Sequence, residues 1–343
     1  MNRCKSCILP DTYPGIQFSN KGICHFCTSY KPKDYWGEEK LREDILCHKG
    51  KRYDCLVGFS GGRDSSYLLW YFVRKLGLRV VAYSANNGFM PGHTLDNMRR
   101  ISEILGVRLI VKEHMYLKKC LKSHLKAWMK KPDASSIGLL CVGCRLGMDL
   151  GTYMFAVREK IPVIAVGGTR FEGKGYKINV FKHRNSYFRG IVKQVLRNPY
   201  WIVNPVCLLT QGMEFWIHYR RILRKRNIKY ISPFSRYIEW KEKTILSVIE
   251  KELEWTKNPK LHSTWRGDCD VAILKGYLYK KALGFNDWDD GLSALVRDQQ
   301  ISREEALMRL KKEGSVSEEI VEEILSHIGI SFPEFKKSIM RFS

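Results

Sequence analysis

The stretch VGFSGGRDSS, Val57–Ser66, decides the fold of this chain. It lies between the short apolar run YDCLVGFS and the segment SSYLLWYFVRKLGL, which has the pattern of a helix with one buried face. A strand, a glycine turn and a helix in this order place backbone N–H groups at a helix N-terminus, where free donors and the helix dipole bind anions. Gly61 and Gly62 let the backbone approach phosphate oxygens because no Cβ stands in the way. The stretch therefore predicts a phosphate-binding turn.

The residues of this turn do not match a Walker A loop, because the required lysine of Gly-Lys-Ser/Thr is absent. SGGRDS, Ser60 to Ser65, instead resembles the SGGxDS loop of the PP-loop ATP pyrophosphatases. That resemblance implies cleavage between the α and β phosphates of ATP, with the loop holding pyrophosphate while AMP passes to a substrate oxygen. A generic glycine turn between strand and helix is the alternative.

The resemblance also implies roles for single residues. Asp64 is expected near Mg²⁺, and the serines of the turn are expected to donate to phosphate oxygens, so the expected catalytic residues are Ser60, Asp64 and Ser65. The strand after the first helix is expected to flank the adenine, and VGGTR to face the nucleotide from the other side, although Gly167 and Gly168 fit an ordinary turn equally well. The expected ATP-binding residues are Ser60, Gly61, Gly62, Arg63, Asp64, Ser65, Ser66, Ala82, Tyr83, Ser84, Gly167 and Gly168.

Around the turn, strand-like runs alternate with amphipathic helical segments. The strand-like runs after the turn are RVVAYSANNG, VRLIVKEH and PVIAVGG, and the further helical segments are TLDNMRRISEILG and LGMDLGTYMFAVREKI. This alternation predicts a parallel sheet covered on both faces. From about Asn204 the pattern is mainly helical and rich in Lys and Arg.

The predicted fold class is therefore α/β: a Rossmann-like PP-loop domain (adenine nucleotide alpha hydrolase-like) with an N-terminal zinc ribbon and a mainly helical C-terminal region. The predicted divisions are a zinc-ribbon module at 1–30, a linker helix at 31–50, the PP-loop ATP pyrophosphatase domain at 51–204 and a substrate or partner region at 205–343.

Two groups of cysteines predict metal sites. Cys4, Cys7, Cys24 and Cys27 have the spacing of a tetrahedral zinc site, and four thiolates fill the coordination sphere, so this site is expected to be structural. Free thiols are the alternative.

The second group is less complete, since the pair Cys141 and Cys144 needs a third ligand, for which Cys269 in the polar stretch WRGDCD is the best candidate. Three cysteines with an open position resemble the metal or iron–sulfur sites of some PP-loop sulfur-transfer enzymes. Buried cysteines without a shared role are the alternative.

The composition of the chain limits the classes of function that are plausible for it. The chain has 343 residues, 44% of them hydrophobic, which is enough for a well-buried core. A formal net charge of +24 predicts attraction to nucleotides, nucleic acid or an anionic membrane, without choosing among them. Neither a spanning apolar run nor a signal-peptide pattern is present, so a cytoplasmic enzyme is expected, and its eleven cysteines favour metal or catalytic roles over a disulfide scaffold.

Read in order, six segments resemble the N-acetyl sugar amidotransferases of bacterial surface-polysaccharide (LPS O-antigen) biosynthesis over nearly the whole length. They are CKSCILPDTYPGIQF, GICHFC, VGFSGGRDSSYLL, CVGC, RGDC and GFNDWDDGLSALVRDQQISREEAL. The resemblance implies that the acetamido oxygen of a nucleotide-linked sugar attacks the α-phosphate of ATP and that ammonia then displaces AMP, giving an acetamidino group. It also implies ATP and Mg²⁺ as cofactors and a separate glutaminase subunit as the ammonia source, with no nucleic acid expected. Arg266, Asp268 and Arg297 are candidate substrate contacts; pairing with local acids is the alternative for the two arginines.

Other functions would also explain these features of the sequence. A PP-loop tRNA thiolation enzyme would share the loop, the cysteines and the positive charge. A non-enzymatic zinc-ribbon binding module would not need the intact loop. EFWIHYRRILRKR, residues 214–226, predicts either a helix on an anionic membrane, which would make the protein peripheral, or a core helix with a basic solvated side.

Overall fold

The computed structural model describes residues 2–48, 50–114, 116–172, 196, 198–200 and 228–342. Within these residues the centre of the fold is a parallel sheet of five strands in the order β3-β2-β1-β4-β5. The strands are β1 (Cys55–Gly58), β2 (Val80–Asn86), β3 (Arg108–Glu113), β4 (Val163–Val166) and β5 (Lys229–Ile231). Because the strands are parallel, their carboxyl ends share one edge, where ligands bind in open α/β sheets. The order places β1, which leads into the phosphate turn, in the middle of that edge.

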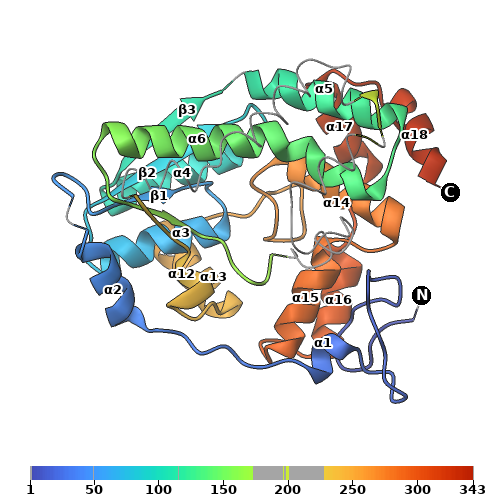
Figure 1. Cartoon of the computed structure of the whole chain (residues 1–343), viewed down its shortest axis with the longest axis horizontal. Coiled ribbons are helices and arrows are strands. Elements are labelled where there is room, and N and C mark those ends of the chain that lie inside the picture. Colours follow the sequence, from blue (N-terminus) through green and yellow to red (C-terminus); the bar gives the residue numbers. More distant parts are fainter. Residues whose placement is uncertain are drawn as a thin grey trace.

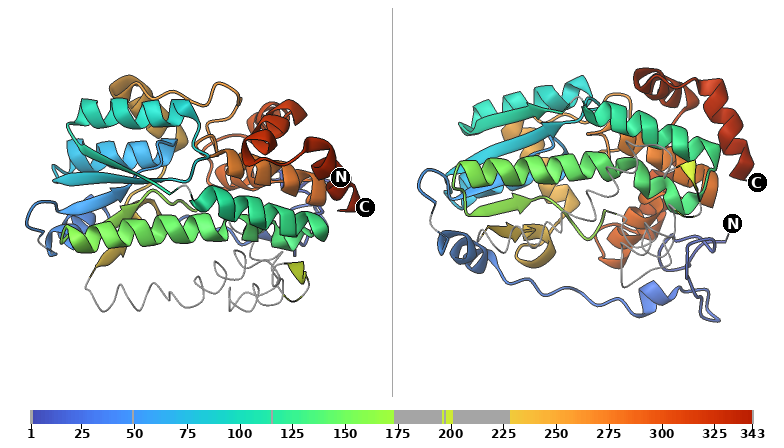
Figure 2. Two further views of the ribbon diagram at one scale, coloured as in Figure 1. Left: turned by 90° about the horizontal axis from the view of Figure 1, so that it is seen from above. Right: turned by 45° about the horizontal axis from the view of Figure 1, so that its top comes forward.

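Helices cover both faces of the sheet (Figures 1 and 2). Side chains of β1 alternate between the faces: Val57 belongs to the core beneath α3, whereas Leu56 belongs to the core beneath α6. On the first face α13 packs outside α3, so this side is three layers deep. The helices around the sheet are α3 (Arg63–Trp70), its π-helical continuation η1 (Tyr71–Lys75), α4 (Gly92–Leu105), α6 (Val142–Arg158), α12 (Pro233–Arg236) and α13 (Glu242–Leu253).

This architecture confirms the predicted fold class, a parallel α/β domain with an N-terminal four-cysteine module and a mainly helical C-terminal region. The sheet, however, continues past the predicted boundary at Asn204, because β5 pairs with β4 through Ile231 and its neighbours. A strand of three residues after a run of basic side chains is too short to show a period in the sequence. The helix α5 (Tyr116–Lys130) and the 3₁₀ helix η2 (Ala134–Cys141) were not predicted.

Two of the C-terminal helices begin at serine caps. Ser302 accepts a hydrogen bond from the backbone N–H of Glu305 at 3.0 Å, and Ser317 caps the next helix through Ile320. The helices are α14 (Asp270–Leu283), α15 (Asp287–Arg297), α16 (Arg303–Glu313), α17 (Glu318–Ile328), α18 (Phe332–Ile339) and the short 3₁₀ helix η3 (Met340–Phe342). In the part of the chain that the structure describes, none of the helices has the length and apolar character needed to cross a membrane. The stretch 214–226 lies outside the described residues.

The N-terminal module packs against the C-terminal helices rather than standing apart, and both chain ends lie at the same end of the molecule (Figure 1). Tyr13 lies 5.2 Å from Phe285, ring centre to ring centre, and its hydroxyl is 3.1 Å from the Asp290 carboxylate. After α1 (His25–Thr28) the chain runs along the molecule to α2 (Glu38–Leu46) beside the sheet. The four-cysteine module and the C-terminal helices therefore share one core.

Candidate ATP-binding and metal sites

The turn between β1 and α3 is built so that glycine is required at one position. Gly61 has φ +73°, and a Cβ there would lie 2.7 Å from the carbonyl oxygen of Thr94. The Gly61 carbonyl accepts a hydrogen bond from the Trp255 indole at 3.0 Å. Gly62 is the N-cap of α3, so the first backbone N–H groups of the helix face the space in front of the turn.

The serines of the turn form a local network. The hydroxyl oxygens of Ser60 and Ser65 lie 3.1 Å apart, and the Ser65 and Ser66 hydroxyls both donate to the Gly62 carbonyl. Ser60 and Ser65 line the cavity described below, while Ser66 is fully buried beneath the turn. Two hydroxyls are thus placed beside a helix N-terminus, where they can donate to an anion.

The turn forms one wall of a cavity of about 340 Å³. Gly167 and Gly168, after β4, line the cavity next to the turn; a Cβ at Gly167 would lie 3.1 Å from the backbone of Asp64. The carboxyl end of β4 and the start of α3 therefore approach each other as closely as backbone allows. The remaining walls come from α4, from Glu172 after β4 and from the segment around 255–268. Their polar residues are His93, Thr94, Glu172, Asn258, Ser263, Thr264, Arg266 and Asp268.

Asp64 lines the cavity at the first turn of α3. Its Oδ1 accepts hydrogen bonds from Arg63 Nε at 3.0 Å and from the Trp240 indole at 2.9 Å. Burial raises the pKa of the Asp64 carboxyl, and the Arg63 charge acts against this rise. Asp64, Glu172 and Asp268 all line this cavity, although their ligand atoms do not all lie within 4.8 Å of one another; carboxylate oxygens are ligands that suit Mg²⁺.

The Arg63 side chain is buried, with an exposed fraction of 6%. Its Nη1 lies 2.7 Å from the Glu242 carboxylate and 3.1 Å from the Thr264 hydroxyl, and its guanidinium stacks between Trp240 and Trp265. The charge of Arg63 is therefore already paired, and its contribution to a phosphate would come from its backbone N–H.

The predicted adenine neighbours Ala82, Tyr83 and Ser84 are buried inside β2. Among the described residues that line this cavity none of the three is present. The backbone carbonyl of Tyr83 accepts a hydrogen bond from the Phe59 N–H at 2.8 Å, and the Tyr83 ring packs against Phe155. The observed role of Tyr83 is therefore to hold the sheet together. Their contact with adenine stays a prediction.

The three candidate substrate residues divide between two places. Arg266 and Asp268 line the cavity, with Asp268 Oδ2 3.0 Å from the position of a Cβ at Gly62. Arg266 has φ +58° and donates to the Glu172 carbonyl at 2.7 Å, with Asp287 3.5 Å away. Arg297 lies elsewhere: its Nη1 is 3.7 Å from Cys7 Sγ, because the end of α15 packs on the N-terminal module.

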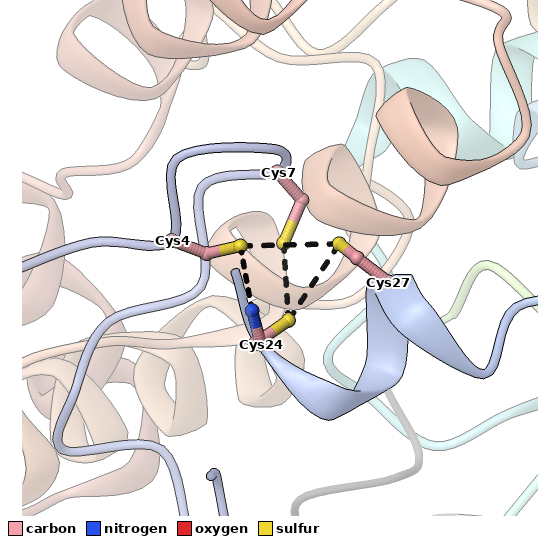
Figure 3. A group of neighbouring side chains, drawn as sticks. All are labelled: Cys4, Cys7, Cys24 and Cys27. Atoms are coloured by element: carbon pink, nitrogen blue, oxygen red, sulfur yellow. Dashed lines mark hydrogen bonds between the residues drawn. The ribbon is translucent and has the colours of Figure 1, made fainter. Parts of the chain in front are cut away.

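Cys4, Cys7, Cys24 and Cys27 converge, with their four sulfur atoms within 4.8 Å of one another (Figure 3). Sulfur–sulfur distances of 3.6, 3.8 and 3.9 Å match the roughly 3.8 Å expected for tetrahedral ligands with bonds of about 2.3 Å. Two backbone N–H groups donate to Cys4 Sγ, and Arg303 donates to the carbonyl oxygens of Cys4 and Cys7. The group is therefore suited to hold a metal ion, with its thiolate charge offset by neighbouring donors.

The second group of cysteines also gathers, more loosely. Asn87 Nδ2 lies 3.0 Å from Cys144 Sγ and 3.7 Å from Cys269 Sγ, and Lys275 Nζ lies 3.4 Å from Cys141 Sγ. Burial raises the pKa of Cys144 and raises that of Cys269 to about 12. Within the described residues, only the N-terminal group has at least three ligand atoms within 4.8 Å of one another.

Several residues of the site could not be predicted from a motif in the sequence. Glu242 and Trp240 lie more than 170 positions beyond the turn, and Glu172 and Asn258 stand in stretches without a motif. Their proximity is a product of the tertiary fold, which spacing along the chain does not encode. Trp265 lies within the recognised stretch WRGDCD, and Glu172 follows VGGTR by two residues.

Three comparisons with known proteins found similarities over different shares of the chain. Residues 263–343 match the family described as "LPS biosynthesis protein WbpG-like, C-terminal domain". An uncharacterized protein of Methanocaldococcus jannaschii is 28% identical over 120 residues, which are 33% of this chain and 43% of the relative, so the match spans less than half of that relative. A solved structure, the U34-tRNA thiolase NcsA from Methanococcus maripaludis with its 4Fe-4S cluster, is 14% identical, covers 88% of this chain and 87% of its own, and gives a TM-score of 0.34. A likeness at that level carries no functional information.

Proposed function

We propose that the chain is the synthetase subunit of an ATP-dependent, AMP-forming amidotransferase that acts on a nucleotide-linked N-acetyl sugar in bacterial surface-polysaccharide biosynthesis. One observation carries the proposal. The SGGRDS turn and residues 263–268 line the same cavity, and residue 263 is where the match to the LPS biosynthesis domain begins. A phosphate-binding turn and a polysaccharide-related domain thus meet at one site.

The chemistry fits such a site. An amide oxygen is a poor leaving group, so ammonia cannot displace it directly. When the acetamido oxygen attacks the α-phosphorus of ATP, the bond to pyrophosphate breaks and the oxygen becomes part of a good leaving group. Ammonia then forms a bond to the activated carbon and AMP departs with the former acetamido oxygen. The protein's contribution is positioning and neutralisation of phosphate charge, which Ser60, Ser65 and the α3 N-terminus can provide.

The cofactors follow from the donor sets. We assign Mg²⁺ to Asp64, because its carboxylate lines the cavity beside the turn that would hold the phosphates of ATP. We assign Zn²⁺ to the four N-terminal cysteines, since a closed set of four thiolates is typical of structural zinc. A separate glutaminase as the ammonia source and a cytoplasmic location belong to the same proposal.

The direct test is incubation of the protein with Mg·ATP, ammonium and a panel of UDP- or CMP-linked acetamido sugars. The proposal expects AMP, pyrophosphate and a sugar product one mass unit lighter, since NH replaces O. Glutamine without a partner protein should not replace ammonium. Formation of ADP, or AMP formation that no sugar stimulates, would contradict it.

A tRNA thiolation enzyme is the second candidate, and one observation favours it: Cys144 and Cys269 lie beside Asn87, and Cys141 is near enough to Cys269 to interact with it electrostatically. This function would require a metal or iron–sulfur cluster at these thiols and tight tRNA binding. Anaerobic purification followed by iron and sulfide analysis tests the first requirement. Binding of tRNA at moderate salt, with a steep salt dependence, tests the second.

A further inference from the structure

Arg63 occupies the variable position of the SGGxDS turn, yet its side chain is withdrawn from solvent. The exposed fraction of this side chain is 6%, whereas a cation that binds phosphate at the mouth of a cavity would be more exposed. A buried guanidinium is costly unless it is paired and hydrogen-bonded. The partners of Arg63 therefore indicate why an arginine is tolerated here.

The principal partner is Glu242, the first residue of α13. Its Oε1 accepts hydrogen bonds from Arg63 at 2.7 Å and from the Trp265 indole at 2.6 Å, while its Oε2 accepts from Arg309 at 2.6 Å. Burial acts to raise the pKa of Glu242, but the hydrogen bonds and charges of Arg309 and Arg63 outweigh it, so that the pKa is lowered. An ionised carboxylate between two arginines fixes the Arg63 guanidinium in place.

The other end of the same guanidinium reaches the predicted magnesium ligand. Arg63 Nε donates to Asp64 Oδ1 at 3.0 Å, and the Trp240 indole donates to the same oxygen at 2.9 Å. Two donors on one oxygen define the plane of the carboxylate, and neither of them uses Oδ2. Asp64 itself lines the cavity.

We propose that Arg63 is a positioning residue: clamped by Glu242 between two tryptophans, it orients the Asp64 carboxylate for the divalent cation that accompanies ATP. The proposal rests on the proposed function and adds a role for the C-terminal region. Trp265, within the matched stretch 263–343, donates to Glu242 and stacks on Arg63, so the C-terminal region supplies part of the clamp.

The chain supplies a matched control for the test. Arg309 pairs with the same Glu242 carboxylate and with Glu313, rather than with Asp64. Arg63→Met and Arg309→Met therefore each remove one guanidinium from Glu242, and only the first removes a donor from Asp64. The readout is Mn²⁺ affinity, measured by electron paramagnetic resonance in the presence of a non-hydrolysable ATP analogue, with the melting temperature measured alongside.

Arg63→Met should weaken Mn²⁺ binding about tenfold, as loss of a charge-assisted hydrogen bond implies. Arg309→Met should change Mn²⁺ affinity less than about twofold. Both variants should lower the melting temperature. Should Arg63→Met fail to fold, Arg63→Lys keeps the charge without the forked donors, and at least threefold weaker binding is expected. Unchanged Mn²⁺ affinity in the Arg63 variants, or equal weakening by Arg309→Met, would overturn the positioning role. A wild-type protein that binds Mn²⁺ no better with the analogue than without it would refute the proposed function, and the positioning role with it.

Discussion

Two features of the turn require glycine at position 61, and experiments can separate their effects. The φ of +73° at Gly61 strains any other residue, and a Cβ would also clash with the Thr94 carbonyl. Gly77 has φ +62° with open space around it, so it shares the first constraint but not the second.

Gly61→Ala should therefore cost more stability than Gly77→Ala and should also weaken binding of an ATP analogue. Left-handed strain alone costs on the order of 1 kcal/mol, and the clash should at least double this. Urea unfolding and analogue titration of both variants measure the two effects. Equal destabilisation with unchanged ATP binding would show that the turn is not held as the structure indicates.

His124 is a buried residue whose protonation should control stability. Its side chain has no exposed surface, and burial lowers the pKa of its imidazole to about 4, although a backbone hydrogen bond with Leu140 acts in the opposite direction. Because the folded pKa lies below the unfolded value of about 6.5, the unfolded state binds the extra proton, and stability falls as the pH drops from about 6.5 towards 4.

Between pH 7.5 and pH 5 the wild-type protein should lose about 2 kcal/mol through this histidine. His124→Gln, which does not titrate in this range, should lose correspondingly less over the same interval, even if its stability at pH 7.5 is lower. Urea unfolding of both proteins at the two pH values provides the comparison. Identical pH dependence in the two would contradict a buried neutral His124.

At the scale of elements, the four-cysteine module is tied to α15 and α16 rather than to the sheet. Arg303, at the start of α16, donates to the Cys4 and Cys7 carbonyls, and Arg297, at the end of α15, approaches Cys7 Sγ. Loss of the metal should therefore loosen these helices as well as the module itself.

Cys4→Ser, or prolonged treatment with a strong chelator, should raise amide hydrogen exchange in α15 and α16 and lower the melting temperature, while the strands β1 to β3 stay protected. Cys47→Ser is the matched control, since Cys47 is exposed and lies outside the metal-binding group. Mass spectrometry under native conditions should show one metal ion lost from the first variant only. Exchange confined to the first thirty residues would contradict the coupling.

The parts of this structure that the sequence predicted are those whose signal is local. The strand–turn–helix around Gly61 and the four-cysteine group each lie within a short stretch whose residue types follow directly from phosphate and metal chemistry. β5 was missed because a three-residue strand has no period. The helix α5, by contrast, does carry a helical period in Leu117, Leu121, Leu125 and Trp128, and this local pattern was overlooked. Arg297 was expected at the substrate site, and its position beside Cys7 depends on tertiary packing that no spacing reveals.

At the scale of the whole molecule, the C-terminal region completes the cavity that the sheet begins. The turn, Gly167 and α4 supply the sheet-side walls, whereas Arg266 and Asp268 come from residues 263–343, the stretch that matches the WbpG-like C-terminal domain. The net charge of +24 suits a nucleotide and a nucleotide-linked sugar, and it suits an RNA equally well, so charge does not decide the substrate.

Transfer of an oxygen isotope from sugar to nucleotide distinguishes adenylation from other uses of ATP. The substrate is a nucleotide-linked sugar whose acetamido oxygen is ¹⁸O, incubated with ATP, Mg²⁺ and ammonium, and the nucleotide products are analysed by mass spectrometry. Adenylation at the SGGRDS turn predicts AMP that carries one ¹⁸O atom, together with unlabelled pyrophosphate. ADP as the product, or AMP without the label, would contradict the account.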